Sequence, residues 1–344
     1  MEQPIFKAGS EKRFSEFIAG LGKEKLALIS HTDLDGISAA KVANAVLGAD
    51  YVRFVNYEEL NGNLVEELKR EKIKNVVFTD LFIKEKLFLE EIGKFAEVLI
   101  IDHHLFGEDL NSDKIVFLNA QGYCATYLCY YLFSKVQDIS YLDWLVACAS
   151  LADWQYFQNQ GFMKEVYERY GDRAFVADPE RIKSGKLWDL QWTLSLALIY
   201  FKDSLRNVFD SLGKEFGEIG DLGKHAGEVQ LELDRLLGLF EKEKEEIQGG
   251  WLFVLPESRF SLSSLVSTIV SSQRKGETIV ILRSDGKYYH VSSRRQDGGV
   301  DLNEWMQIVL KGLADASGGG HKKAAGGRIL VGDLEAFKRR LQKE

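Results

Sequence analysis

The sequence lacks long apolar runs, internal repeats and low-complexity tracts. No stretch approaches the roughly 18 consecutive apolar residues that are typical of a membrane-spanning helix. The opening segment, MEQPIFKAGSEKRFSEF, contains no apolar core of the kind found in signal peptides. We therefore expect a cytoplasmic protein that does not associate with a membrane.

Cysteine is also scarce. The three cysteines, Cys124, Cys129 and Cys148, are odd in number, lie in apolar segments and lack the spacing of a metal site. Free cysteine behaves as a small apolar residue, and disulfides are rare in the cytoplasm. We expect three buried thiols, with neither a disulfide nor a zinc site.

Positive charge is in deficit, with a formal net charge of −8 over 344 residues. This balance argues against a protein that coats duplex nucleic acid by charge alone, although it leaves room for a local basic groove. Carboxylates gathered around metal ions would contribute to the negative excess. The hydrophobic content of 45% is normal for a soluble globular protein, and the length suits two domains with a helical insert.

The first 155 residues alternate between strand and helix patterns. This alternation favours an α/β fold, in which a parallel sheet carries helices on both faces. The predicted strands cover residues 26–30, 51–57, 75–80, 96–104 and 114–119.

The pattern changes after residue 155, and residues 160–250 read as helices. Strand patterns return beyond Gly249–Gly250, with a hairpin turn at Asp285–Gly286. We therefore predict three parts: an N-terminal parallel-sheet domain (1–155), a helical connector (156–250) and a smaller C-terminal α/β domain (251–344).

Polar side chains gather where the predicted parallel strands end. The carboxyl ends of such strands meet at one edge of the sheet, where open α/β proteins place their sites. One more carboxylate, Asp153 in SLADW, ends a predicted helix. The strand-terminal residues are His31, Asp33 and Asp35 in SHTDLDG, Asp80 after NVVFT, and Asp102, His103 and His104 after EVLII.

Taken singly, each of these residues has an ordinary interpretation. A lone Asp after a strand is commonly a helix cap or turn residue, and HTDLDG is a calcium-loop mimic without the later acidic ligands. Together, five aspartates and three histidines would converge on one edge of the sheet. The negative charges of the aspartates repel one another unless a cation or a proton lies among them. Carboxylate and imidazole ligands without thiolate suit Mn²⁺ or a similar divalent ion. The ligands suffice for two ions, about 3.5–4 Å apart, bridged by one carboxylate.

The order of these motifs resembles that of the DHH phosphoesterases, which are named for the triplet seen at 102–104. ASGGGHKKAAGG (316–327), preceded by VSSRR (291–295), resembles the DHH-associated C-terminal domain of RecJ-type nucleases and oligoribonuclease-like phosphodiesterases. The resemblance covers roughly residues 20–155 and 250–344. SLADW lacks the glycine-rich lead-in that many relatives have before the residue matching Asp153.

The resemblance implies two bound divalent ions, Mn²⁺ in preference to Mg²⁺ or Co²⁺, which activate the water that attacks phosphorus. His104 would face the scissile phosphate, and Asp102 would orient a histidine. The implied metal ligands are His31 and Asp33 for one ion, Asp35, His103 and Asp153 for the second, and Asp80 as the bridge.

In the C-terminal domain, Gly318, Gly319 and Gly320 offer unobstructed backbone N–H groups, and we expect them to form an anion-binding nest at the start of a helix. Alone, the glycine run would read as a flexible loop. His321 would add a donor, and Arg294 or Arg295 could bind a phosphate or stack on a base. The first domain would then cut and the second would hold the nucleotide, with the active-site cleft between them.

The leading hypothesis is a metal-dependent phosphodiesterase acting on single-stranded RNA or DNA, as an exonuclease or a short-oligonucleotide nuclease. The alternative substrate is a cyclic dinucleotide or another small nucleotide. A manganese pyrophosphatase is disfavoured by GGGHKKAAGG, and an inactive replication scaffold by the complete ligand set. The helical connector could bind a replication or repair protein or form a homodimer, and Trp154 could contact substrate.

Overall fold

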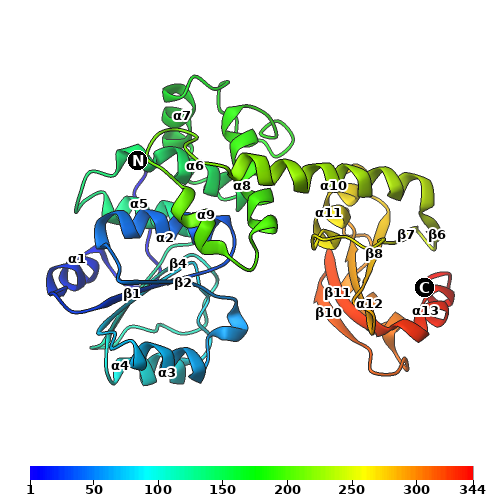
Figure 1. Cartoon of the computed structure of the whole chain (residues 1–344), viewed down its shortest axis with the longest axis horizontal. Helices are drawn as coiled ribbons and strands as arrows, with labels where there is room; N and C mark the ends of the chain where they lie inside the picture. Colours follow the sequence, from blue (N-terminus) through cyan, green and yellow to red (C-terminus); the bar gives the residue numbers. More distant parts are fainter. Residues whose placement is uncertain (344) are drawn as a thin grey trace. The chain divides into compact units, whose positions relative to one another are not determined.

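The computed structural model describes residues 1–343 and divides the chain into two compact units, Met1–Gly227 and Glu228–Glu344. The division falls within the long helix α10 (Leu222–Glu243), drawn in yellow-green in Figure 1. Gly249–Gly250 lies inside the second unit, at the turn that joins two antiparallel strands. The division at residues 155 and 250 is a different subdivision of the chain and stays a prediction.

The first unit contains a five-stranded parallel sheet in the order β2-β1-β3-β4-β5. Every residue of β1, β3 and β5 is buried, which explains why these strands are continuous apolar runs in the sequence. The predicted parallel sheet is confirmed. Its strands are β1 (Leu26–Ser30), β2 (Tyr51–Phe54), β3 (Asn75–Thr79), β4 (Glu97–Asp102) and β5 (Ile115–Asn119).

Helices cover both faces of this sheet (Figure 1). Leu64, Leu68 and Leu89 of α3 and α4 pack with Ile29 and Phe78 in one apolar core. Helices α2 and α5 pack against each other and lie on the other side of the sheet. The helices of these two layers are α2 (Leu34–Leu47), α3 (Gly62–Arg70), α4 (Lys86–Gly93) and α5 (Ala125–Phe133), with a short 3₁₀ turn at Tyr57–Glu59.

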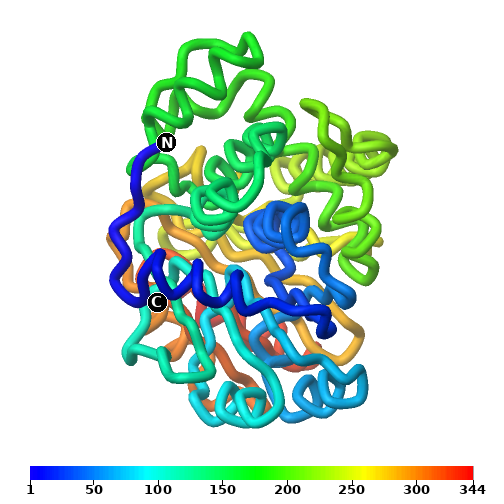
Figure 2. Tube along the Cα trace, turned by 90° about the vertical axis from the view of Figure 1, so that its left-hand side faces the viewer, coloured from blue at the N-terminus to red at the C-terminus, as the bar shows by residue number. Residues whose placement is uncertain are grey.

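The N-terminal segment runs along the edge strand β5 before helix α1 (Glu11–Gly20), as Figure 2 shows in dark blue. The backbone N–H of Lys7 donates to the carbonyl of Asn119, and Ala8 forms an isolated bridge with the same residue. This contact lies at the end of β5, where Asn119 pairs with Asp102 of β4.

A helical layer follows the sheet, as the sequence predicts. Helix α6 packs against α2 and α8. The three cysteines are buried and free, which confirms that expectation. No helix among residues 1–343 combines the length and apolar character needed to cross a bilayer. The helices of this layer are α6 (Asp143–Ala152), α7 (Gln160–Arg169), α8 (Lys186–Tyr200) and α9 (Leu205–Ser211).

The second unit contains a six-stranded sheet in the order β10-β11-β9-β8-β7-β6, in which only the β7–β8 pair is parallel. Strands β8 and β9 pair across Asp285–Gly286, where Gly286 has φ +94°, so the predicted hairpin is confirmed. Its strands are β6 (Glu245–Ile247), β7 (Gly250–Val254), β8 (Thr278–Ser284), β9 (Tyr288–Arg294), β10 (Ser317–His321) and β11 (Ala324–Leu330); its helices are α11 (Ser263–Gln273), α12 (Leu302–Leu310) and α13 (Leu334–Leu341).

The glycine run at 318–320 lies in strand β10, which corrects the expected nest at the start of a helix. A Cβ at Gly318 would come within 2.6 Å of the Leu310 side chain and 2.8 Å of the Gly326 carbonyl oxygen. Glycine therefore lets β10 approach α12 and β11 closely, and this packing accounts for the residue type.

Candidate metal centre

The opening motif forms the junction between β1 and α2. Asp33 is the N-cap of α2, and its Oδ1 accepts a hydrogen bond of 2.9 Å from the Gly36 N–H. A Cβ at Gly36 would lie 2.5 Å from the carbonyl oxygen of His31. Glycine at this position therefore allows the first turn of α2 to fold back against His31, and this turn carries both carboxylates of the motif.

Asp80 occupies the centre of the cluster. It follows β3 with φ +56°, a left-handed conformation that Asp tolerates better than most residues, and its N–H donates to the Ile101 carbonyl. Its Oδ1 lies 3.2 Å from Nε2 of His103, and its Oδ2 lies 3.7 Å from Nδ1 of His31. The carboxylate thus faces a histidine on each side.

Three overlapping groups of possible ligand atoms occur among the described residues, each with all of its atoms within 4.8 Å of one another, and two of them together contain all six predicted ligands. One group is His31, Asp33 and Asp80; the other is Asp35, His103 and Asp153. The structure therefore brings together all six residues that the sequence predicts as ligands, with Asp80 in the first group and beside His103 of the second. The assignment of an ion to each group stays a prediction.

Several ligand atoms in these groups lack a hydrogen-bond partner although they are buried. They are Nδ1 of His31, Oδ2 of Asp80 and Oδ2 of Asp153. Nδ1 of His31 does lie 2.9 Å from Oδ2 of Asp33, but without the angle of a hydrogen bond. Buried polar atoms are nearly always paired, and three orphaned atoms in one cluster fit a bound cation.

The carboxylates repel one another in the absence of a cation. Burial, together with the neighbouring Asp35 and Asp33, raises the pKa of Asp153 to about 8 and raises that of Asp80 well above its ordinary value. Burial also raises the pKa of Asp35. At Asp33, burial acts in the same direction, but the close contact with His31, the charge of His31 and the hydrogen bond from the Gly36 N–H outweigh it and lower the pKa to about 2.

Asp35 is held by the start of helix α5, a contact that the sequence does not predict. Its carboxylate accepts hydrogen bonds from the N–H groups of Ala125 (2.7 Å) and Thr126 (2.9 Å) and from the Thr126 hydroxyl (2.6 Å). A helix N-terminus favours a negative charge, and these donors fix the orientation of the carboxylate. No local signal marks Thr126, because it lies 91 residues along the chain.

His104 contacts Asp102, the residue that the resemblance implies as the orienting partner of a histidine. Its Nδ1 lies 2.8 Å from Asp102 Oδ1, and its carbonyl oxygen accepts a hydrogen bond from the Asn119 side chain. Burial alone would lower the pKa of His104, but the hydrogen bond and charge of Asp102 outweigh it and raise the pKa. Asp102 and His104 also form a possible ligand group with Asp80 and His103.

Tyr57 is a second residue that the sequence analysis missed. Its hydroxyl lies 3.4 Å from Nε2 of His104, and its ring stacks on His31 with centroids 5.0 Å apart. Burial and the charges of Asp80 and Asp102 raise the pKa of the phenol, so it stays protonated. Its place just after β2, at the same sheet edge as the other clusters, is a signal that could have identified it.

The predicted phosphate-binding residues of the second unit lie at one end of its sheet. Ala324 pairs with His321 on one side and with Arg294 on the other. The Arg294 guanidinium donates a hydrogen bond of 3.1 Å to the Ser264 hydroxyl, while its Nε is buried without a hydrogen-bond partner. The Arg295 guanidinium is engaged by Asp297 at 2.8 Å. Arg294 is therefore the freer of the two arginines.

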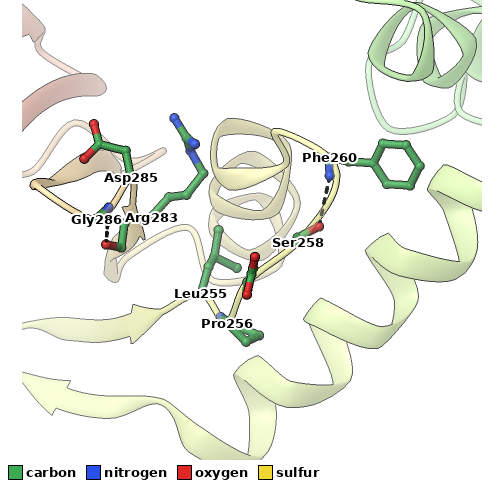
Figure 3. A pocket seen from close by; sticks show the side chains of 9 residues that line it. Leu255, Pro256, Ser258, Phe260, Arg283, Asp285 and Gly286 are labelled. Carbon is green, nitrogen blue, oxygen red and sulfur yellow. Dashed lines mark hydrogen bonds between the residues drawn. The ribbon is translucent and has the colours of Figure 1, made fainter.

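The second unit also has a hollow of about 480 Å³, lined by Leu255, Pro256, Phe260, Arg283 and Asp285 among others (Figure 3). Arg283 pairs with His290 near the end of β8, whereas Arg294 pairs with Ile279 near its beginning. The hollow is therefore separate from the predicted phosphate-binding residues.

Comparisons with known proteins identify one domain and the fold. Residues 258–344 match the DHHA1 domain family. The search of curated protein sequences found no match. The fold resembles that of exonuclease RecJ bound to manganese, with a TM-score of 0.68, 17% identity, and coverage of 99% of this chain and 95% of that one.

Two further solved structures share the fold. CDC45 from Entamoeba histolytica has a TM-score of 0.64 and 12% identity, and coverage is 97% of this chain and 98% of that chain. The pGpG-specific phosphodiesterase PggH from Vibrio has a TM-score of 0.56 and 14% identity, with 92% and 97% covered.

The chain therefore carries a DHHA1 domain in residues 258–344 and shares the fold of these structures. Its parallel five-stranded sheet, followed by a second sheet domain, matches the RecJ-like architecture.

Proposed function

We propose that the chain is a divalent-metal-dependent phosphodiesterase that hydrolyses single-stranded RNA or DNA, as an exonuclease or a short-oligonucleotide nuclease. The observation that carries the proposal is the pair of ligand groups with the Asp80 carboxylate between His31 and His103. The RecJ structures of similar fold are described as bound to Mn²⁺ or Mg²⁺, which supports the same kind of ion here.

In this proposal His31 and Asp33 would hold one ion, Asp35, His103 and Asp153 would hold the other, and Asp80 would be a ligand shared by both sites. Two ions bound there would supply a water of lowered pKa and neutralise charge on the phosphate oxygens. The protein's own contribution is to fix the ligands: Thr126 and the start of α5 orient Asp35, and the left-handed turn at Asp80 directs its carboxylate into the cluster.

His104 is the proposed proton donor to the leaving oxygen. Asp102 binds Nδ1, so Nε2 is the nitrogen left for a substrate, and the ring is about one-third exposed. The hydrogen bond and charge of Asp102 raise the pKa of His104 and so stabilise the protonated ring that a proton donor needs. Tyr57 contacts this same Nε2 and would have to yield it, or share it, when a phosphate arrives.

The second unit is proposed to hold the nucleotide through Arg294, His321 and the backbone of Gly318–Gly320. The Arg294 guanidinium is bonded to the Ser264 hydroxyl and not to a carboxylate, and the glycine strand carries no side chains at Gly318–Gly320. Binding of a single strand belongs to this proposal. Binding of a replication or repair protein by the helical connector (156–250), or formation of a homodimer through it, stays a prediction.

A small-nucleotide substrate is the second candidate function. It is favoured by the fold shared with a pGpG-specific phosphodiesterase over almost the whole of both chains. An inactive scaffold is disfavoured, because all six ligand positions carry side chains able to bind a metal. The DHHA1 match likewise disfavours a manganese pyrophosphatase.

The test is a product time course with Mn²⁺, using end-labelled RNA and DNA strands, a dinucleotide and a cyclic dinucleotide, with a chelator control. Stepwise shortening of the long strands supports the nuclease. Cleavage confined to the dinucleotide or cyclic substrate supports the small-nucleotide enzyme instead. If no substrate gives a metal-dependent product, the phosphodiesterase proposal is wrong.

A further inference from the structure

Trp154 occupies a backbone conformation that is unusual for a large side chain. Helix α6 ends with Asp153 as its C-cap, and the N–H groups of Trp154 and Gln155 donate to Leu151 (3.3 Å) and Ser150 (3.0 Å). These bonds define a Schellman motif, and Trp154 has φ +57° at the position where glycine is preferred. A strained residue beside a candidate ligand is a feature expected of functional sites.

Trp154 is 41% exposed despite the size of its side chain. It meets Trp188 edge-on with centroids 5.9 Å apart, and Tyr156 at 6.3 Å. The Lys183 ammonium lies over the ring, 5.7 Å from its centroid. These neighbours restrain the ring while they leave much of its surface open to a ligand.

The preceding residue belongs to the metal centre. The Asp153 carboxylate lies 3.7 Å from Nδ1 of His103 in the second ligand group. A phosphate bound at that group would carry a nucleobase one sugar away, and an exposed indole is a stacking platform that accepts any base.

We propose that Trp154 stacks on a nucleobase of the substrate, with Trp188 and Lys183 positioning the ring. The inference rests on the proposed function and names its ligand: the recognised group is the flat face of a base, without selection among bases. A bulky residue then replaces glycine in the Schellman motif because the ring binds substrate.

The test compares Trp154→Gly with Trp154→Phe. Glycine suits the left-handed backbone, so it removes the ring without disturbing the end of α6. Phenylalanine keeps a stacking surface. Val136→Ala is the control, because Val136 is similarly exposed (45%) but follows the end of α5 opposite to the Asp35 contact.

Kinetics and fluorescence-anisotropy binding are measured on trinucleotides that carry natural bases or one abasic position, each position in turn. We expect Trp154→Gly to raise KM about 5- to 150-fold on the natural trinucleotide, with a smaller change in kcat. At one position of the trinucleotide, removal of the base should weaken binding to the wild type by a similar factor. The same removal should leave binding to Trp154→Gly unchanged. Trp154→Phe should recover most of the loss.

The inference is overturned if Trp154→Gly weakens binding of the natural trinucleotide and of every abasic trinucleotide by the same factor, or if it changes the binding of none of them. A wild type that binds with this base dependence but cleaves nothing keeps the stacking site and refutes the proposed function. A wild type that neither binds nor cleaves any trinucleotide refutes both.

Discussion

Nε2 of His103 lies 3.2 Å from Oδ1 of Asp80, and this contact links the two ligand groups of the candidate metal centre. Asp80 also lies 3.7 Å from His31, so one carboxylate contacts a histidine of each group. Because the side chain is buried and its pKa is raised well above the ordinary value by burial and by Asp35, the metal-free cluster is held under electrostatic repulsion.

Asp80→Asn should therefore separate activity from stability. The amide keeps the shape of the side chain and removes the charge, so metal-dependent activity should fall by at least about 100-fold. The midpoint of thermal unfolding in EDTA should stay unchanged or rise, because one repelling charge is gone. Activity above one-tenth of the wild-type value in this variant would contradict a shared metal ligand.

Stability without metal should depend on pH in a direction set by Asp153. Its pKa is about 4 in an unfolded chain and about 8 in the folded protein, so the folded state binds the extra proton. The stabilisation is complete below about pH 4 and is lost as the pH rises through about 8. We expect the midpoint temperature of unfolding in EDTA to decrease as the pH is raised from 5.5 to 8.

Mn²⁺ should reverse this trend, since it replaces the protons on the carboxylates. The increase in unfolding midpoint on adding Mn²⁺ should be larger at pH 8 than at pH 5.5. Asp153→Asn should flatten the pH dependence in EDTA. An Mn²⁺-induced shift that is equal at both pH values would argue against metal binding by these groups.

Thr126 should be needed for metal affinity although it is not a predicted ligand. Thr126→Val keeps the shape but removes the hydroxyl that donates to Asp35, which should cost about 1–3 kcal/mol in unfolding free energy. Metal affinity, measured by calorimetry, should fall about 10- to 100-fold. Thr126→Ser retains the hydroxyl and should stay close to the wild type in both measurements.

Gly36→Ala should disrupt the junction that presents His31 and Asp33. The new Cβ would lie 2.5 Å from a backbone carbonyl oxygen, so α2 or β1 must shift. We expect the free energy of unfolding to decrease by about 1–3 kcal/mol and metal binding to be lost. Gly62→Ala is the matched control: a Cβ there meets nothing within 4 Å, and alanine should stabilise α3. Equal effects of the two substitutions in denaturant unfolding would refute this account.

Much of the fold follows from local patterns. Buried parallel strands such as Leu26–Ser30 are short apolar runs, and the residues after them meet at one edge because all strands point the same way. The hairpin at Asp285–Gly286 is equally local. The glycine run at 318–320 misled the sequence analysis, because glycine serves a close strand–helix contact as well as a nest.

The sequence by itself determined which side chains reach the carboxyl edge of the first sheet, His31 and Asp80 among them, since strand direction and side-chain order are properties of the chain. Only the tertiary structure decided the contact of Thr126 with Asp35 and that of Tyr57 with His104. Each joins segments distant in the chain, and a packed interior selects such pairs by shape and hydrogen bonding, which leave no local periodicity to detect.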